Sequence, residues 1–258
     1  MLEFLETYLP SADAIKGQYI EPFIGGGAVF FFVNPKRALL SDVNPELIDL
    51  YRGIRRSPSE VWLEYCKFGS NKRAYQQVRE LGTQRLLVDR AARTLFLNRT
   101  CFKGMWRHNL DGEFNVGYGG QERRWAISEN NLKQVAAMLR KAKIRCCDFE
   151  EVVNACESDD FLFLDPPYRP GEREQVNDHY IGRQFTFEDH RRLAAALQRA
   201  KKRGVKWVLT TSAHPDIINL FRGNQITAIP RGTGRMPGII ASNSNEVLIT
   251  HCPTKRGV

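Results

Sequence analysis

Short apolar runs alternate along the chain with segments in which apolar residues recur every three or four positions. The runs predict buried strands, and the spaced segments predict amphipathic helices. Strands are expected at 18–23, 37–44, 143–147, 160–164, 206–212, 225–230 and 245–252, with helices between most of them. Strands that alternate with helices are typical of α/β proteins. We therefore predict a doubly wound, mostly parallel, Rossmann-like sheet.

The alternation is interrupted once, in the middle of the chain. Residues 55 to about 98 predict three polar helices, and residues 98–126 are rich in Gly, Asn, Arg and aromatic residues without a helical period. Alternation returns with a helix at about residue 128. We expect residues 1–54 and 128–258 to form one α/β domain, and residues 55–127 to be a mostly helical insertion in it.

Composition narrows the class of protein. No apolar run approaches the ~20 residues of a membrane span, and the acidic N-terminus does not resemble a signal peptide. The six cysteines include no C-x-x-C pair, so neither a disulfide framework nor a zinc site is expected. Reduced thiols predict a cytoplasmic protein without metal, and we expect a monomer. The net charge of +9 favours a polyanionic partner.

The stretch FLFLDPPY combines a buried strand with an acidic, rigid corner. Phe161 to Leu164 are all apolar, and the strand must stop at Asp165 because Pro166 and Pro167 lack the N–H that a central strand needs. The carboxyl edge of a parallel sheet is where ligands bind. Asp165, Pro166, Pro167 and Tyr168 are therefore the candidate catalytic residues.

A second candidate site follows the first strand. Gly25-Gly26-Gly27 allows the backbone to approach a ligand closely, and Asp42 ends the next strand, where an acid can accept both hydroxyls of a ribose. The turn is neither a G-x-G-x-x-G fingerprint nor a P-loop. Together these features favour an adenosine-bearing cofactor without a pyrophosphate.

Four segments together resemble the Dam-type DNA adenine methyltransferases: EPFIGGGAVF, LLSDVNPELIDLY, NRTCFKGMWRHNLDGEFNVGYG and FLFLDPPY. The resemblance implies methyl transfer from S-adenosylmethionine to the N6 amino group of a flipped adenine in double-stranded DNA. It implies that Asp42 binds the cofactor's ribose and that Asp165 to Tyr168 form the methyl-transfer site. The other implied cofactor contacts are Glu21, Phe23, Gly25, Gly27, and, for the adenine ring, Asp148 and Phe149.

The insertion is the expected DNA surface. Its basic residues interleave with the aromatic residues Phe102, Trp106, His108, Phe114 and Tyr118, a mixture that suits phosphate contact and base stacking. Arg99 and Lys103 stand four apart, as on one face of a helix end, and are expected to contact phosphates. Arg107 follows Gly104 and is expected to read a base edge. The complete set of candidate DNA-binding residues is Arg99, Lys103, Arg107, Asn109, Arg123 and Arg124.

The chain also departs from the family pattern. The Lys-Trp-x-Gly-Gly-Lys segment with which members usually begin is absent, which implies either a truncated start or weakened cofactor binding. Lys103 replaces the usual Asn, and Gly117 replaces the usual Pro, so recognition of GATC is not assured. Two alternatives stay open. One is a ribosomal RNA guanine-N2 methyltransferase, which shares Asp-Pro-Pro-Tyr but ordinarily lacks the insertion. The other is a catalytically silent DNA-binding relative.

Overall fold

The computed structural model describes residues 2–82, 84–109, 112–120, 127–167, 185–230 and 245–251. The chain folds as two compact units. The first comprises the described parts of 1–43, 147–175 and 185–258, and the second contains Asn44–Cys146. The second unit therefore includes the expected insertion of residues 55–127 and also two helices and one strand that were expected in the α/β domain. The DNA-recognition role of residues 55–127 stays a prediction.

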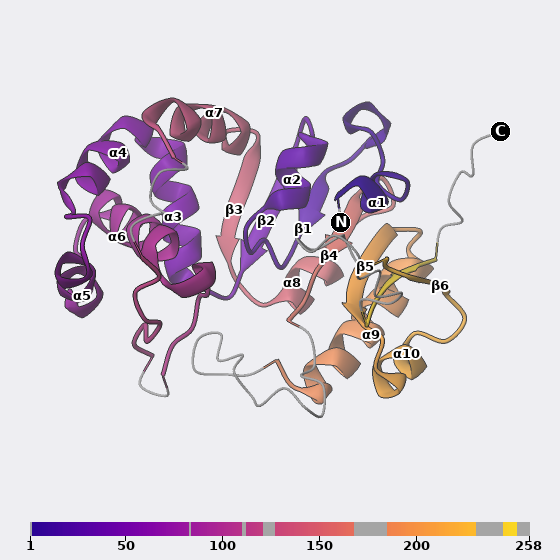
Figure 1. The fold of residues 1–258 in the computed structure, drawn as a ribbon. Coiled ribbons are helices and arrows are strands. Elements are labelled where there is room, and N and C mark those ends of the chain that lie inside the picture. The colour runs from indigo at the N-terminus through magenta and orange to yellow at the C-terminus, as the bar shows by residue number, and fades with distance from the viewer. Residues whose placement is uncertain are drawn as a thin grey trace. The chain divides into compact units, whose positions relative to one another are not determined.

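The first unit is built on a mixed sheet in the order β2-β1-β4-β5-β7-β6. The strands β1, β2, β4 and β5 run parallel, and β7 runs antiparallel to both β5 and β6. Figure 1 shows β1, β4 and β5 side by side. The bounds are β1 (Tyr19–Glu21), β2 (Ala38–Asp42), β4 (Phe161–Leu164), β5 (Lys206–Ser212), β6 (Gln225–Ala228) and β7 (Glu246–Thr250). The predicted doubly wound, mostly parallel α/β fold is confirmed.

Continuous apolar strands and the apolar faces of helices form the core of this unit. All four residues of β4 are buried, as its unbroken apolar run predicts. Trp207 and Leu209 of β5 pack in the same cluster as Leu193 and Leu197 of α9. The helices are α1 (Leu2–Glu6), α2 (Ala28–Val33), α8 (Phe149–Asn154), α9 (Phe187–Lys202) and α10 (Pro215–Leu220), with a 3-10 turn at Ala12–Ala14.

The second unit is mainly helical. It contains α3 (Pro45–Arg56), α4 (Pro58–Lys67), α5 (Lys72–Glu80), α6 (Leu87–Thr100), the 3-10 turn η2 (Phe102–Gly104), α7 (Glu129–Leu139) and β3 (Ala142–Cys146). The helix α6 is largely buried and packs against α3, α4 and α5. Asn44 caps α3 as predicted, because its side chain accepts the backbone N–H groups of Glu46 and Leu47 at 2.9 and 3.2 Å.

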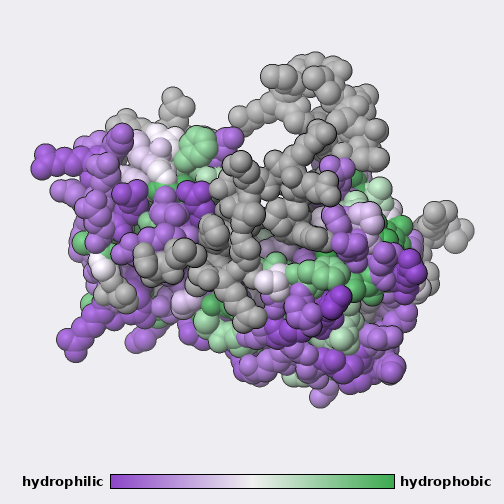
Figure 2. All heavy atoms as spheres, turned by 90° about the horizontal axis from the view of Figure 1, so that it is seen from below, coloured by the Kyte–Doolittle hydropathy of each residue, from purple (hydrophilic) through white to green (hydrophobic). Residues whose placement is uncertain are grey.

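The surface of this unit is mostly polar. Figure 2 shows hydrophilic side chains gathered on the left, over the helices of the second unit, with a few apolar residues among them. Leu63, Leu86 and Phe102 are the most exposed large apolar side chains of its described residues. Over the described part of the chain, no helix has both the length and the apolar character needed to cross a bilayer.

Candidate active site and nucleic-acid interface

The topology of the first unit brings three predicted acids to one sheet edge. β1 lies between β2 and β4 and runs parallel to both, so the carboxyl ends of these strands meet on the same side. Glu21 ends β1, Asp42 ends β2, and Asp165 directly follows β4. Strand order reverses at β1, and this switch point is where open α/β sheets bind ligands.

Asp165 is held by a threonine from the neighbouring strand. The Oγ1 of Thr210 in β5 donates to Oδ1 of Asp165 at 2.6 Å. Thr210 is buried, whereas Asp165 is exposed and Pro166 behind it is buried. The carboxylate thus reaches solvent from a backbone fixed by the strand and by the proline pair. Tyr168, the last residue of the candidate catalytic set, lies outside the described residues.

Glu21 is a buried carboxyl with an unusual proton affinity. Only 2% of the residue is exposed, and the hydroxyl of Tyr19 donates to its Oε2 at 2.6 Å. The pKa of Glu21 is raised to about 8, chiefly by burial and in smaller part by the negative charge of Asp165, whereas the Tyr19 hydrogen bond opposes the change. Glu21 therefore keeps its proton at neutral pH in a large fraction of molecules.

The glycine turn after β1 has the backbone that its sequence predicts. Gly25 and Gly27 have positive φ angles of 44° and 68°, which side-chain-bearing residues rarely adopt. The N–H of Gly25 faces Oδ2 of Asp42 at 3.4 Å. A Cβ placed on Gly26 would meet nothing within 4 Å, so the turn leaves open space on that side. These residues fit a small ligand that approaches the backbone beside Asp42.

Asp148 and Phe149 begin α8 close to the same edge. The N–H of Cys147 donates to the carbonyl of Asp42 at 3.2 Å, which places this turn beside the end of β2. Asp148 caps α8 by accepting the N–H of Glu150 at 2.9 Å. The ring of Phe149 packs against Phe23, with ring centroids 5.3 Å apart. Acids beside an aromatic wall and an open glycine turn suit an adenosine group, as predicted for S-adenosylmethionine.

In the second unit, Arg99 lies in the last turn of α6, and Lys103, Arg107 and Asn109 follow this helix on a hairpin whose arms are joined by the bridges Cys101–Tyr118 and His108–Phe114. The helix ends at Thr100, and its cap Cys101 is extended. Lys103 has φ of 54° and Gly104 has φ of 67°, so the helix does not continue to Lys103. The expectation that Arg99 and Lys103 share one helix face is wrong, because Cys101 between them is extended and Lys103 itself lies in the left-handed region.

The hairpin uses two of the candidate residues for its own structure. Nε of Arg107 donates to Oδ1 of Asn115 at 2.9 Å. Asn109 closes the hairpin, since its side chain accepts the N–H of Glu113 at 2.8 Å and donates to that residue's carboxylate at 3.1 Å. Arg99 is half-buried, and its Nε is buried without a hydrogen-bond partner among the residues that the structure describes. Lys103 is exposed. Arg123 and Arg124 lie outside the described residues.

The aromatic residues of the hairpin divide into packed and exposed ones. Trp106, His108 and Phe114 contact one another, with ring centroids 4.6 to 6.0 Å apart. Tyr118 packs on Tyr75 and donates its hydroxyl to the carbonyl of Ser70. Phe102 differs, because 48% of the residue is exposed. Among the five predicted aromatic residues, Phe102 is the most exposed.

A partly buried polar cluster joins this hairpin to the start of α3. Glu46 contacts Nε2 of His108 at 2.8 Å and accepts from Nη1 of Arg93 at 3.3 Å. Arg93 also donates to the carbonyls of Val78 and Arg79, at 3.1 and 2.9 Å. Glu46, Arg79, Arg93 and His108 line a cavity of about 880 Å³ within the second unit. The cluster anchors the hairpin at His108 to three helices.

Comparison with known proteins identifies the family of this chain. Residues 1–232 match the model of the D12 class N6 adenine-specific DNA methyltransferases. The chain belongs to this family. The predicted resemblance is therefore confirmed, and the enzyme class is an adenine-specific DNA methyltransferase. The match also decides against the ribosomal RNA alternative.

Three relatives illustrate the similarity. The DNA N-6-adenine-methyltransferase of Escherichia phage P1 is 36% identical over 89% of this chain, which spans only 30% of that protein. The type II methyltransferase M.MjaIII of Methanocaldococcus jannaschii is 34% identical over 82% of this chain and 80% of its own length. The DNA adenine methylase of Vibrio cholerae is 28% identical over 89% of this chain and 83% of its own.

Two contacts of the site were not anticipated from the sequence. Thr210 stands in the apolar strand segment WVLTTS, and Tyr19 opens a strand that was expected only to be buried. A polar residue near the carboxyl end of a buried strand is a usable signal for Thr210. No local pattern indicates that Tyr19 would pair with Glu21.

Proposed function

We propose that this enzyme transfers a methyl group from S-adenosylmethionine to the N6 amino group of an adenine that leaves the stack of double-stranded DNA. The observation that carries the proposal is the position of Asp165. It follows β4 at the switch point, it is exposed, and Thr210 fixes its Oδ1 at 2.6 Å. Glu21 and Asp42 end the two neighbouring strands.

Asp165 acts on the amino group of the substrate. An adenine amino nitrogen is a poor nucleophile because its lone pair is delocalised into the ring. Asp165 and the carbonyl of Pro166 accept the two amino hydrogens, which draws the nitrogen towards tetrahedral geometry. Because the strand and the prolines already fix both acceptors, this alignment costs little reorganisation. The proton that the nitrogen loses leaves through the solvent-exposed carboxylate.

The cofactor contacts are assigned from the same edge. Asp42 binds the ribose hydroxyls, the glycine turn passes beside them, and Asp148 and Phe149 contact the adenine ring. Glu21 and Phe23 line the site from β1 and the turn after it. When bound, the cofactor supplies an electrophilic sulfonium methyl group.

DNA is held by the hairpin that follows α6. A base inside a duplex cannot reach an active site, so the target must be extruded. Phe102 supplies an exposed aromatic face for stacking, Lys103 and Arg99 contact phosphates, and Arg107 reads a base edge. Asn109 keeps the hairpin closed. Arg123 and Arg124 are further candidate phosphate contacts, and the cytoplasmic, monomeric state stays a prediction.

Transfer of a radiolabelled methyl group to unmethylated duplex DNA tests the proposal, with ribosomal RNA as the control substrate. Asp165→Ala should abolish transfer and leave cofactor binding within about tenfold, because Asp165 acts on the base. Asp42→Ala should instead weaken cofactor binding by about tenfold or more through loss of a charge-assisted hydrogen bond. Full activity of Asp165→Ala would overturn the assignment. A wild-type chain that binds DNA and transfers nothing would favour the silent relative.

A further inference from the structure

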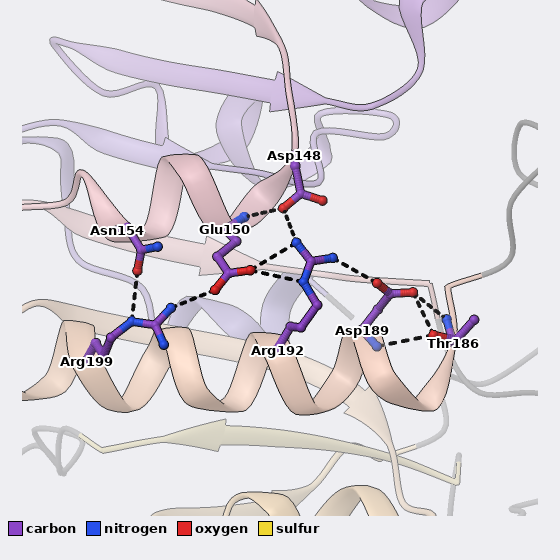
Figure 3. A network of polar contacts seen from close by, with 7 residues as sticks. All are labelled: Asp148, Glu150, Asn154, Thr186, Asp189, Arg192 and Arg199. Atoms are coloured by element: carbon purple, nitrogen blue, oxygen red, sulfur yellow. Dashed lines mark hydrogen bonds and ion pairs between the residues drawn. The ribbon is translucent and has the colours of Figure 1, made fainter.

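Arg192 of α9 lies at the centre of an acidic network in the first unit (Figure 3). Its Nη2 contacts Oδ1 of Asp148 at 2.8 Å, its Nη1 contacts Oδ1 of Asp189 at 2.9 Å, and its Nε contacts Oε2 of Glu150 at 3.0 Å. One guanidinium thus engages three carboxylates from two helices. This geometry is far more constrained than that of a single surface ion pair.

The same guanidinium also lies over an aromatic ring. Its central carbon is 4.9 Å from the ring centroid of Phe149, a cation–π distance. Phe149 in turn packs against Phe23 and Phe185, with ring centroids 5.3 and 5.8 Å apart. Arg192 therefore contacts both residues assigned to the cofactor's adenine ring, one through charge and the other through stacking.

The contacts of Asp148 leave its two oxygens in different roles. Oδ1 accepts the N–H of Glu150 at 2.9 Å as well as the guanidinium of Arg192. Within the described residues, Oδ2 takes part in no hydrogen bond, and Figure 3 shows it turned away from Arg192. A carboxylate oxygen can only accept hydrogen bonds. Oδ2 is thus suited to a ligand group that donates one.

Arg192 is itself fixed at the start of its helix. Asp189 belongs to a capping box with Thr186, in which the Asp189 carboxylate accepts the N–H and hydroxyl of Thr186 at 2.9 and 2.8 Å. Because the cap holds Asp189 and α8 holds Glu150, the guanidinium has little freedom to turn. Its direction in turn sets the direction of the Asp148 carboxylate.

We propose that Arg192 is a positioning residue that makes the cofactor site selective for adenine over hypoxanthine. The inference rests on the proposed function. Adenine carries an amino group at C6, which donates to Oδ2 of Asp148. Hypoxanthine carries an oxygen there, which is repelled by a fixed carboxylate. A site built to hydrogen-bond one group rejects an analogue that lacks it, provided that the protein group cannot move aside.

The test compares the binding of S-adenosylhomocysteine and S-inosylhomocysteine by titration calorimetry. The wild-type protein should prefer the adenosyl compound by at least about tenfold. Arg192→Ala should reduce this preference by about tenfold, chiefly by weakening the adenosyl compound, because Asp148 is then free to rotate. Arg192→Lys keeps the charge but loses the fork of donors, and it should fall between the two.

Arg199 provides the matched control. It lies on the same helix and donates to Oε1 of Glu150 at 2.8 Å and to Asn154 at 3.1 Å, without contact to Asp148. Arg199→Ala should leave the preference unchanged. A general structural loss would instead weaken both ligands alike in every variant, and thermal unfolding shows which variants fold.

The outcomes distinguish a failure of the proposed function from a failure of the role assigned to Arg192. If the wild-type protein does not bind S-adenosylhomocysteine, the proposed function and this inference fall together. If it binds and Arg192→Ala retains the wild-type preference, the role of Arg192 is overturned while the proposed function stands. Should Arg192→Ala not fold, folded Arg192→Gln gives the same decision, and an unchanged preference in it overturns the role.

Discussion

In the first unit, the acids at the strand ends face the ligand edge of the sheet, whereas in the second unit many of the basic residues are bound to the protein's own backbone. Arg52 donates to the carbonyl of Ile144 at 2.9 Å, and Arg55 donates to that of Ala142 at the same distance. Arg93 donates to two carbonyls and to Glu46. These arginines join helices to one another and to β3.

The difference shows which kind of sequence signal predicts where a side chain lies. Asp165 was identified by its position, because a strand that must stop leaves its next residue at the sheet edge. Arg52, Arg55 and Arg93 entered the sequence analysis only through the net charge, and composition does not distinguish a residue that binds phosphate from one that binds a carbonyl. The net charge of +9 therefore gives too high an estimate of how many basic side chains are available to contact DNA.

The largest expected effect is on stability. It shows whether a buried acid at a strand end destabilises the folded protein as the pH rises. Because the pKa of Glu21 is raised to about 8 by burial, the folded protein holds a proton that the unfolded chain has lost above about pH 4.5. Its contribution to stability is fully present below pH 4.5 and is lost as the pH rises through about 8, by roughly 3–5 kcal/mol in total.

Glu21→Gln cannot ionise, so its stability relative to the wild-type protein should rise by that amount between pH 4 and pH 9. Urea unfolding at several pH values measures the difference. A constant difference between the two proteins across this range would show that Glu21 titrates normally and that the buried acid costs nothing.

The next effect tests how Asp165 is held. Thr210→Val removes the hydroxyl that donates to Asp165 at 2.6 Å while preserving the shape of the side chain. We expect kcat to fall by about 10–100-fold with cofactor affinity nearly unchanged, since a misplaced acceptor affects the transition state most.

Thr211 supplies the control for this measurement. It is fully buried, and its Oγ1 has no hydrogen-bond partner among the described residues. Thr211→Val should leave kcat unchanged and should not lower stability, because no hydrogen bond is lost. Equal losses of kcat in both variants would mean that the strand, and not the Thr210 hydroxyl, positions Asp165.

The smallest effects separate two kinds of basic residue in the hairpin. Arg107, oriented by its 2.9 Å bond to Asn115, should read a base, so Arg107→Ala should cost roughly 1–3 kcal/mol on the preferred duplex and little on a scrambled one. Exposed Lys103 should contact a phosphate, so Lys103→Ala should weaken both duplexes alike and reduce the salt slope by about one.

Binding to preferred and scrambled duplexes at several salt concentrations distinguishes these residues. Equal losses on both duplexes for Arg107→Ala would make Arg107 another phosphate contact. No loss for either variant would mean that Arg107 and Lys103 do not contact DNA and, like Arg93, at most stabilise the fold.

The order of helices and strands was predictable because its signals are local. Asn44 and Pro45 indicate the start of a helix, and Pro166 with Pro167 indicate the end of a strand. The pairing of Asp165 with Thr210 and of Asp148 with Arg192 was not predictable, since each joins residues about 45 positions apart. The prediction that Arg99 and Lys103 share one helix face failed for another reason. Lys103 has a left-handed backbone, and the chain changes direction there.

Two backbone hydrogen bonds join the ends of the hairpin at its base. The N–H of Phe102 donates to the carbonyl of Gly117, and that of Gly119 to the carbonyl of Thr100, both at 2.8 Å. A Cβ on Gly119 would collide with the backbone of Cys101, so this closure requires glycine there. Doubling a closed loop costs only about 0.6 kcal/mol in chain entropy. The loop beyond this closure can therefore change in length at little entropic cost, and, under the proposed function, such changes would alter the DNA contacts without disturbing the two ends of the hairpin.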